Sequence, residues 1–231
     1  MTPPYPSAHQ IEHLEDFTQH EWCNALLSDS SVAKIDTRST AEHHNTDASN
    51  SFFAKTLFTD DAVRAFVSLY RPGRGRAAGI ADAEAVSDAL LGADTSTPDK
   101  KVEGGEHKEK IDGQAALDEP EALILVSLGS GVDGATHRLH GGVTAALLDQ
   151  VMGALIGFSH SNTGATAELN VKYKKAISTP AVVLCRARIV REAGRWIETV
   201  GWVEDGHGQV FAEGRGSFVK SKTDRITAAK I

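Results

Sequence analysis

The sequence has few cysteines, few aromatic residues and no long apolar run. Its 231 residues include two cysteines, and Phe, Trp and Tyr together make up 6%. Because Cys23 and Cys185 are far apart and form no CxxC pair, neither a disulfide framework nor a cysteine zinc site is expected. No stretch of about 18 or more apolar residues is present, so we expect no membrane span.

A basic excess is also missing. The chain has 24 Lys and Arg against 31 Asp and Glu, a formal charge of −7, which argues against a nucleic-acid partner. The first residues, MTPPYPSAHQ, form neither an apolar signal core nor an Arg-rich presequence. The last three, Ala-Lys-Ile, depart from the small-basic-Leu peroxisomal address. We therefore expect a cytoplasmic protein, with the peroxisome as the alternative.

The apolar and charged residues that are present have the balance of a globular protein with one main domain. Hydrophobic residues make up 41% and charged residues 24%. Residues 1–120 have 11 basic and 21 acidic side chains, net −10, whereas residues 121–231 have 13 and 10, net +3. The chain therefore divides into two unlike halves.

The N-terminal half is expected to form a helical extension over residues 1–91. Ile11, Leu14, Trp22 and Leu26 fall near helical spacing, which predicts a first helix.

A second helix is predicted over residues 59–71. Val63, Phe66, Val67 and Tyr70 recur at the spacing i, i+3, i+4, i+7, and a Pro-Gly pair follows the segment. Its apolar stripe is expected to complete the core, although a lid over an acyl tail is an alternative.

Residues 92–120 contain three large apolar residues and no aromatic residue. Burial of so few apolar side chains does not offset the entropy of ordering the segment. We expect an acidic flexible linker or loop here, a folded domain over residues 121–222, and a C-terminal tail over residues 223–231.

From residue 121 onward the pattern becomes β-rich. The run ALILVSLG predicts a short buried strand, and an apolar helix is expected to begin near Gly141. Short turns separate the last strand-like runs, so these strands should pair antiparallel. The expected class is α+β, with an antiparallel sheet around one buried helix. Four strand-like runs follow the helix: TAELNVKYK, AVVLCRARIV, RWIETVGWV and QVFAEGRGSFVK.

Residues 129–134 spell GxGxxG directly after the first strand of this half. A dinucleotide site needs this motif at the start of a helix within a βαβ unit. Here six residues separate it from the predicted helix, and an antiparallel meander follows. We interpret it as a glycine-rich loop and expect no dinucleotide cofactor.

The predicted helix places a carboxylate in its middle, at Asp149. Val143 and Leu147 lie on its apolar side, whereas Asp149 falls among small residues on the other side. Burial of a carboxylate is costly unless it is hydrogen-bonded or paired. Two interpretations remain open from the residues alone: a functional carboxylate, or a structural ion pair with Arg186 or Arg188.

Gly141 and Gly142 open the same helix and favour the functional interpretation. Glycines at a helix N-terminus let a substrate approach free backbone N–H groups, as in an oxyanion hole. Gly142 and Asp149 are seven residues apart, about 10 Å along a helix, so they do not reach one carbonyl group from one chain. If both act on one substrate, a second chain supplies one of them, which implies a symmetric dimer.

The segments HGGVTAALLDQVMG and TAELNVKYKKAI resemble the HGG…D and TAxLNxxYxRPI signatures of hotdog-fold acyl thioesterases. The resemblance is to the phenylacetate-pathway and mitochondrial acyl-CoA thioesterase branch, and most of all to fungal members. Some of those members belong to polyketide pathways. The resemblance spans residues 122–220, and YKKAI departs from the signature by losing a proline while keeping its cations.

The resemblance implies a role for each matching residue. Asp149 would be the general base or the nucleophile, and the Gly142 N–H, with Gly141, would hold the oxyanion. His140 would orient the carbonyl or the start of the helix, and Thr166 would hydrogen-bond the carboxylate or the water from the partner chain. The cations implied for the phosphates of coenzyme A are Lys174, Lys175 and Arg191 or Arg195, although each also fits an ordinary exposed strand edge.

The sequence therefore predicts a homodimeric or homotetrameric hotdog hydrolase. Its expected substrate is an acyl thioester of coenzyme A or of an acyl carrier protein, with no metal and no cofactor. The alternative is a hotdog protein that does not hydrolyse the thioester, either a dehydratase-like polyketide partner or a binder of acyl ligands.

Overall fold

The computed structural model describes residues 11–37, 51–73, 119–160 and 164–222. The predicted linker at residues 92–120, except for its last two residues, and the tail at residues 223–231 lie outside the described residues. The elements before the long helix are α1 (Leu14–Thr18), α2 (Glu21–Leu27), β1 (Lys34–Thr37), η3 (Phe52–Leu57), β2 (Val63–Arg71), β3 (Glu121–Leu128), η6 (Ser130–Val132), β4 (Asp133–Ala135) and β5 (Arg138–Leu139). The long helix and the strands after it are α4 (Gly141–His160), β6 (Gly164–Tyr173), β7 (Ala181–Ala193), β8 (Trp196–Glu204) and β9 (Val210–Lys220).

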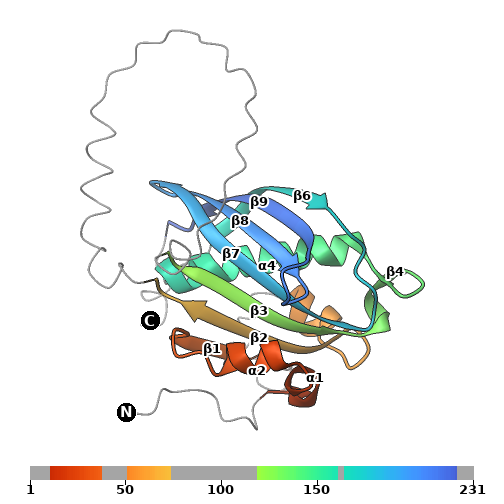
Figure 1. Cartoon of the computed structure of the whole chain (residues 1–231). Helices are drawn as coiled ribbons and strands as arrows, with labels where there is room; N and C mark the ends of the chain where they lie inside the picture. Colours follow the sequence, from red (N-terminus) through yellow and green to blue (C-terminus); the bar gives the residue numbers. More distant parts are fainter. Residues whose placement is uncertain (1–10, 38–50, 74–118, 161–163, 223–231) are drawn as a thin grey trace, which may run out of the picture. The chain divides into compact units, whose positions relative to one another are not determined.

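Seven of the strands form one antiparallel sheet with the order β1-β2-β3-β7-β8-β9-β6. The sheet curves around α4, which lies against its inner face (Figure 1). β7 pairs antiparallel with β8, and β8 with β9, as predicted from the short turns between them. The α+β hotdog architecture, an antiparallel sheet wrapped around one central helix, is therefore confirmed.

Helix α4 is held by apolar side chains that are fully buried against the sheet, including Leu148 and Met152. Glycines in β8 and β9 let it approach closely. A Cβ atom at Gly214 would lie 3.1 Å from the Met152 methyl carbon, and one at Gly216 would lie 2.7 Å from its sulfur. A larger residue at either position would require the Met152 side chain to move.

By length and composition alone, α4 is apolar enough to cross a membrane. This test does not distinguish a membrane span from a buried core helix, so the expectation of no membrane span stays a prediction. The apolar residues of α4 contact the strands, however, as in the core helix of a globular domain.

The helix predicted over residues 59–71 is wrong, because residues 63–71 form strand β2. β2 lies between β1 and β3 and is buried on both faces. Phe66 packs in the cluster around α4, whereas Val67 and Leu69 pack in a second cluster on the outer face. A strand buried on both faces lacks the apolar-polar alternation that marks a half-buried strand, so its apolar residues can match a helical spacing by chance.

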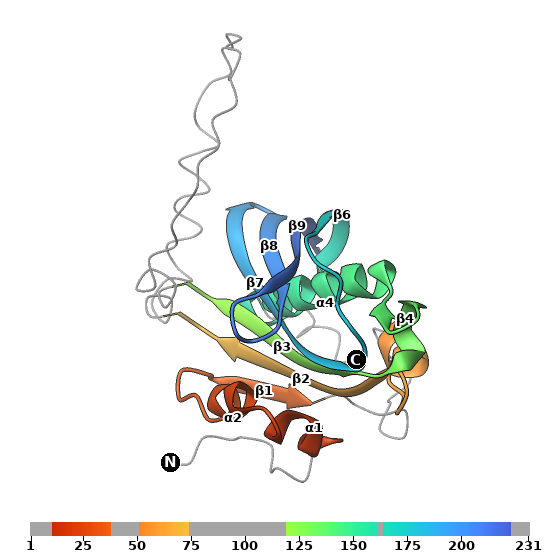
Figure 2. The same ribbon diagram turned by 45° about the vertical axis from the view of Figure 1, so that its right-hand side comes forward.

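The outer face of β2 and β3 is covered by an N-terminal layer of α1 and α2, while β1 extends the sheet beside β2 (Figure 2). Phe17 of α1 and Cys23 of α2 are fully buried there. The predicted first helix is present as two short helices.

The division at residue 121 is wrong, because β1 and β2 belong to the same sheet as the strands after residue 121. The hotdog domain is therefore discontinuous in sequence.

A network of ion pairs crosses the outer face of the sheet at Glu121, whose side chain is 3% exposed. Its carboxylate accepts from Arg71 at 3.0 Å, from Arg188 at 3.1 Å and from Arg186 at 3.4 Å. Arg186 also binds Glu204 at 2.8 Å. All four partners come from neighbouring strands, so the network joins β2, β3, β7 and β8.

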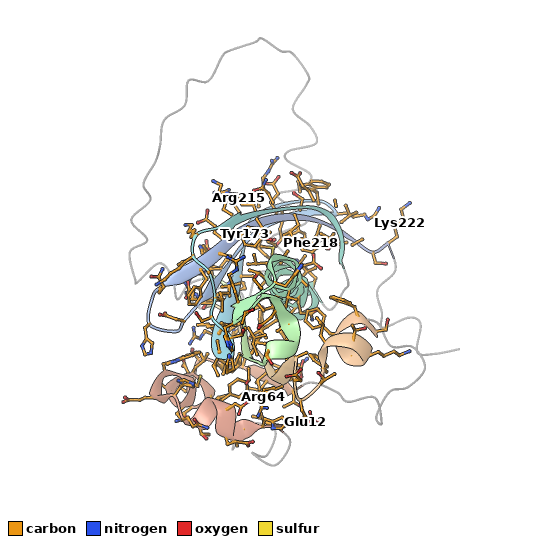
Figure 3. All side chains as sticks on the ribbon, turned by 90° about the vertical axis from the view of Figure 1, so that its right-hand side faces the viewer. Glu12, Arg64, Tyr173, Arg215, Phe218 and Lys222 are labelled. Atoms are coloured by element: carbon orange, nitrogen blue, oxygen red, sulfur yellow. The ribbon has the colours of Figure 1, made fainter. Side chains whose placement is uncertain are left out.

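A second carboxylate, Asp16, ties the N-terminal layer to the sheet. It accepts from Arg64 Nε at 2.9 Å and from the Ser127 hydroxyl at 2.5 Å. Burial raises the pKa of Asp16, but the hydrogen bonds from Arg64 and Ser127 outweigh it, so the pKa lies below its ordinary value. Figure 3 shows Arg64 and Glu12 on the side of the N-terminal helices, away from Tyr173 and Phe218.

Candidate active site

The start of α4 is built around His140. Its carbonyl oxygen accepts from the N–H groups of Val143 and Thr144, and its Nδ1 accepts from the Gly142 N–H at 2.9 Å. Backbone and side chain of one residue thus cap two N–H groups, those of Gly142 and Val143, that a helix start leaves without partners, and the bond from Thr144 is the first regular helical bond. His140 therefore contacts the start of the helix, and the role implied for it there, orienting the helix start or the carbonyl, stays a prediction.

Two glycines make room for the His140 ring. A Cβ atom at Gly142 would lie 3.0 Å from Cε1 and Nδ1 of the imidazole, and one at Gly134 would lie 3.0 Å from its Cδ2. Side chains at either position would displace the ring. Gly134 and Gly142 therefore leave space for the His140 ring, and Gly142 also leaves the backbone accessible.

The hydrogen bond to His140 changes the expected oxyanion donor. Gly142 was expected to offer a free N–H, but this group is already engaged within the chain. Within the described ranges, the Gly141 N–H and the Nε2 atom of His140 have no hydrogen-bond partner in the chain. These two groups are the ones left to bind an anionic oxygen.

Tyr173, at the end of β6, lies against the other side of the helix start. Its hydroxyl donates to the Gly141 carbonyl oxygen at 2.9 Å. A pocket of about 620 Å³ opens beside these groups. It is lined by the His140–Gly142 segment, Tyr173, Arg138, Lys174, Lys175 and apolar residues that include Phe211 and Ile177.

Two of the predicted phosphate-binding cations are at this pocket. Lys174 Nζ pairs with Glu213 at 2.5 Å, and Lys175 Nζ donates to Gln209 at 3.2 Å. The hydrogen bond from Lys174 holds the pKa of the Glu213 carboxyl below its ordinary range. Both ammonium groups thus have partners on β9 or in the turn before it, at one edge of the pocket.

The other two cations are elsewhere in the chain. Arg195 lies before β8, at the end opposite the pocket, and its Nε donates to the Lys220 carbonyl at 2.8 Å. Arg191 pairs with Glu198 at 3.5 Å at that same end of the hairpin. Within one chain, the predicted grouping of Arg191 or Arg195 with Lys174 and Lys175 is therefore wrong.

Asp149 stands in the middle of α4, on the side that faces β6. The hydroxyl of Thr166, near the start of β6, donates to Asp149 Oδ1 at 2.7 Å. The pairing of these two residues was predicted, but the threonine was expected from the partner chain. The structure forms the contact within one chain, because β6 runs back along α4.

The alternative interpretation of Asp149 as a structural ion pair is wrong. Arg186 and Arg188 lie on the outer face of the sheet, where they bind Glu121 and Glu204. α4 lies on the inner face, so the sheet separates these arginines from Asp149. In the described part of the chain, Asp149 has a hydroxyl as its partner and no ion pair.

The residues 129–134 form the glycine-rich loop that was predicted. Gly129 and Gly131 donate to the carbonyl oxygens of Ala62 and Asp61, each at 2.7 Å. A short 3-10 turn and the small β4–β5 ribbon follow, rather than the helix of a βαβ unit. The motif joins β3 to the loop before β2.

Sequence reasoning missed Arg138 and Tyr173 as residues of the pocket. Tyr173 falls within the TAELNVKYK segment, where the tyrosine is part of the family signature, and that was the available signal. Arg138 lies between the two histidines of HRLH, and nothing in its spacing marks it.

A family model matches residues 137–212, from β5 to the start of β9. The match is to the thioesterase superfamily. The matched segment contains the helix start, Asp149, Thr166, Tyr173 and both pocket lysines, whereas Gly134 lies before it. No match was found among curated proteins.

Several solved structures are similar over less than half of this chain. A Bacillus halodurans protein solved with CoA is 28% identical, covering 45% of this chain and 69% of its own, with a TM-score of 0.41. Zebrafish thioesterase superfamily member 2 is 19% identical, covering 44% and 75%, with a TM-score of 0.41. A hypothetical thioesterase protein of Streptococcus pneumoniae, solved with coenzyme A, is 17% identical, covering 45% and 82%, with a TM-score of 0.42.

Proposed function

We propose that this protein hydrolyses an acyl thioester to a free acid and a thiol, with Asp149 as the general base or nucleophile. The observation that carries the proposal is the set of groups that contact the Asp149 carboxylate. Asp149 is held by the Thr166 hydroxyl at 2.7 Å and is not neutralised by a cation in the described chain. A carboxylate oriented in this way is suited to activate water or to attack a carbonyl carbon.

The start of α4 supplies the second part of the chemistry. In the proposed mechanism, the Gly141 N–H and the Nε2–H of His140 donate to the thioester carbonyl oxygen. Negative charge develops on this oxygen in the tetrahedral transition state, and the N-terminal end of a helix dipole stabilises it. Preorganised donors of this kind usually contribute the largest single term in acyl transfer.

The two parts are brought together in a homodimer in this proposal. Among the described residues, no carboxylate of the chain lines the pocket at the helix start. Asp149 is about 10 Å along the helix from Gly142. β6 is the last strand of the sheet, so its outer edge is open in the described chain. Two copies packed along β6 and α4, and related by a two-fold axis perpendicular to these elements, would run antiparallel and place Asp149 of each near the helix start of the other.

The pocket also supports a substrate with an anionic carrier. Lys174, Lys175 and Arg138 lie around the same opening as the proposed carbonyl site. Coenzyme A and the phosphopantetheine arm of a carrier protein both present phosphate groups, which such cations bind. The proposal therefore includes both coenzyme A and a carrier protein as the thiol part of the substrate.

The test is release of free thiol from purified protein mixed with short, long and aromatic acyl-CoA esters. The Asp149→Asn variant runs beside it, with Asp36→Asn as the matched control, because Asp36 is an exposed residue of β1 paired with Lys34. We expect turnover by the wild type and by Asp36→Asn, and its loss in Asp149→Asn.

Two other outcomes would redirect or end the proposal. Thiol release from an acyl thioester of the carrier protein, but from no acyl-CoA ester, would identify the carrier-bound thioester as the substrate. A melting temperature that rises with acyl-CoA, without thiol release from either carrier, would contradict hydrolysis and favour a non-hydrolytic acyl binder.

A further inference from the structure

We propose that Tyr173 is a positioning residue: its hydroxyl fixes the Gly141–Gly142 peptide and through it the tautomer of His140. This inference deepens the proposed function, since His140 Nε2–H is one of the two donors assigned to the thioester oxygen. It concerns a residue that lies on β6 and not on the helix whose start it controls.

The first step is the rigid peptide unit. The Gly141 carbonyl and the Gly142 N–H belong to one planar group, in which the oxygen and the hydrogen point in opposite directions. Tyr173 donates to the oxygen at 2.9 Å, and the N–H donates to His140 Nδ1 at 2.9 Å. The direction of the N–H therefore follows that of the oxygen, which Tyr173 holds together with the first turn of α4.

The second step is the tautomer. A backbone N–H is always a donor, so Nδ1 of His140 must be an acceptor when it takes this hydrogen bond. The proton of the neutral ring is then on Nε2. Nε2 lies between Cδ2, which faces Gly134, and Cε1, which faces Gly142, and His140 lines the pocket. The ring therefore presents a donor where the opposite tautomer would present an acceptor.

The two glycines do not by themselves fix the orientation of the peptide between them. Both residues of the unit lack a side chain, so their backbone dihedrals are restricted less than those of other residues. The Tyr173 ring also packs on Gly141, where a Cβ atom would lie 3.5 Å from Cε1 of the ring. Hydrogen bonds in series polarise one another, so the bond to the carbonyl also strengthens the bond to His140.

The direct test is nitrogen NMR of the imidazole side chains at a pH where His140 is neutral, with His140→Gln to assign its signals. In the wild type we expect a protonated Nε2 and an unprotonated Nδ1. In Tyr173→Phe we expect the two nitrogen shifts to move toward each other, as the ring samples both tautomers.

The matched control is Tyr70→Phe, which removes a hydroxyl 3.4 Å from Ser159 near the other end of α4. We expect Tyr173→Phe to lower kcat about 3- to 10-fold, as for the loss of one hydrogen bond, with KM within about twofold. Tyr70→Phe should change neither the His140 signals nor kcat.

The result that overturns the inference is a proton on Nδ1 in the wild type, or His140 signals in Tyr173→Phe that match those of the wild type. These NMR results do not depend on activity. If the wild type releases no thiol from any ester, the proposed function fails and the NMR comparison still decides the role of Tyr173.

Discussion

The carboxylates on the outer face of the sheet are held by arginines, whereas Asp149 on the central helix is held by a hydroxyl. Glu121 contacts three guanidinium groups, and Asp16 contacts Arg64. Asp149 has Thr166. An ion pair neutralises a carboxylate and serves cohesion, but a hydroxyl orients it and leaves its charge available. Residues of one chemical type thus serve stability on one face and, in our proposal, catalysis on the other.

The variant with the largest expected effect on activity is Asp149→Asn. The amide keeps the shape of the side chain but is neither a base nor a nucleophile, so we expect kcat to fall by roughly 10²–10⁴. Because Asp149 is not part of an ion pair in the described chain, the urea midpoint should stay close to that of the wild type. Full activity in this variant would exclude Asp149 as the base or nucleophile.

Glu121→Gln is expected to lower stability and to leave kcat unchanged, the opposite of Asp149→Asn. It leaves three arginines on the outer face without their shared anion, and loss of a buried partner of this kind costs about 3 kcal/mol of unfolding free energy. Urea unfolding measures the loss. The kcat of the folded variant should match that of the wild type, and a large fall in kcat at full stability would break the division between the two faces.

Two threonine variants sharpen the comparison within the inner region. Thr166→Val removes the hydroxyl that orients Asp149, and we expect kcat to fall about tenfold with little change in stability. Thr199 is 2% exposed, and its hydroxyl donates to the Gly216 carbonyl at 3.1 Å. Thr199→Val should lower unfolding free energy by about 1 kcal/mol and leave kcat unchanged. Equal effects of the two variants on kcat would argue against an orienting role for Thr166.

The smallest expected effect is the acid sensitivity of the N-terminal layer. A carboxyl whose pKa is lower in the folded state stabilises the fold above its unfolded pKa, and this contribution is lost as pH falls through the folded value. For Asp16 the loss should begin below about pH 4, near its ordinary pKa. Denaturation of the wild type and Asp16→Asn should therefore show a stability difference that narrows below this pH. A constant difference down to pH 2 would contradict the shift.

Local pattern was sufficient for the central helix and the C-terminal strands. The apolar side of α4 and the small residues around Asp149 are visible in a helical projection, and turns with glycine separate β7, β8 and β9. The pairing of Asp149 with Thr166 came from the family signature. The signature did not show that Asp149 and Thr166 meet within one chain, because this contact depends on how β6 runs back along the helix.

Features set by distant contacts were not predictable in this way. β2 was taken for a helix because both of its faces are covered, one by α4 and the other by α1 and α2. Arg195 was grouped with the lysines because spacing along the chain does not show which ends of two strands meet. The role of Tyr173 depends on the end of β6 meeting the start of α4, some 30 residues earlier.

The pairing of β2 with β3 also determines the order in which the fold is completed during synthesis. Arg71 and Glu121 are neighbours in the sheet but 50 residues apart in the chain, so β2 leaves the ribosome several seconds before its partner at about 5–20 residues per second. An apolar strand that lacks one of its neighbours in the sheet is prone to aggregate during that interval. The helices that cover its outer face, α1 and α2, and its other neighbour in the sheet, β1, precede it in the chain. They are therefore already synthesised when β2 emerges, and can cover one face and one edge of the strand before β3 exists.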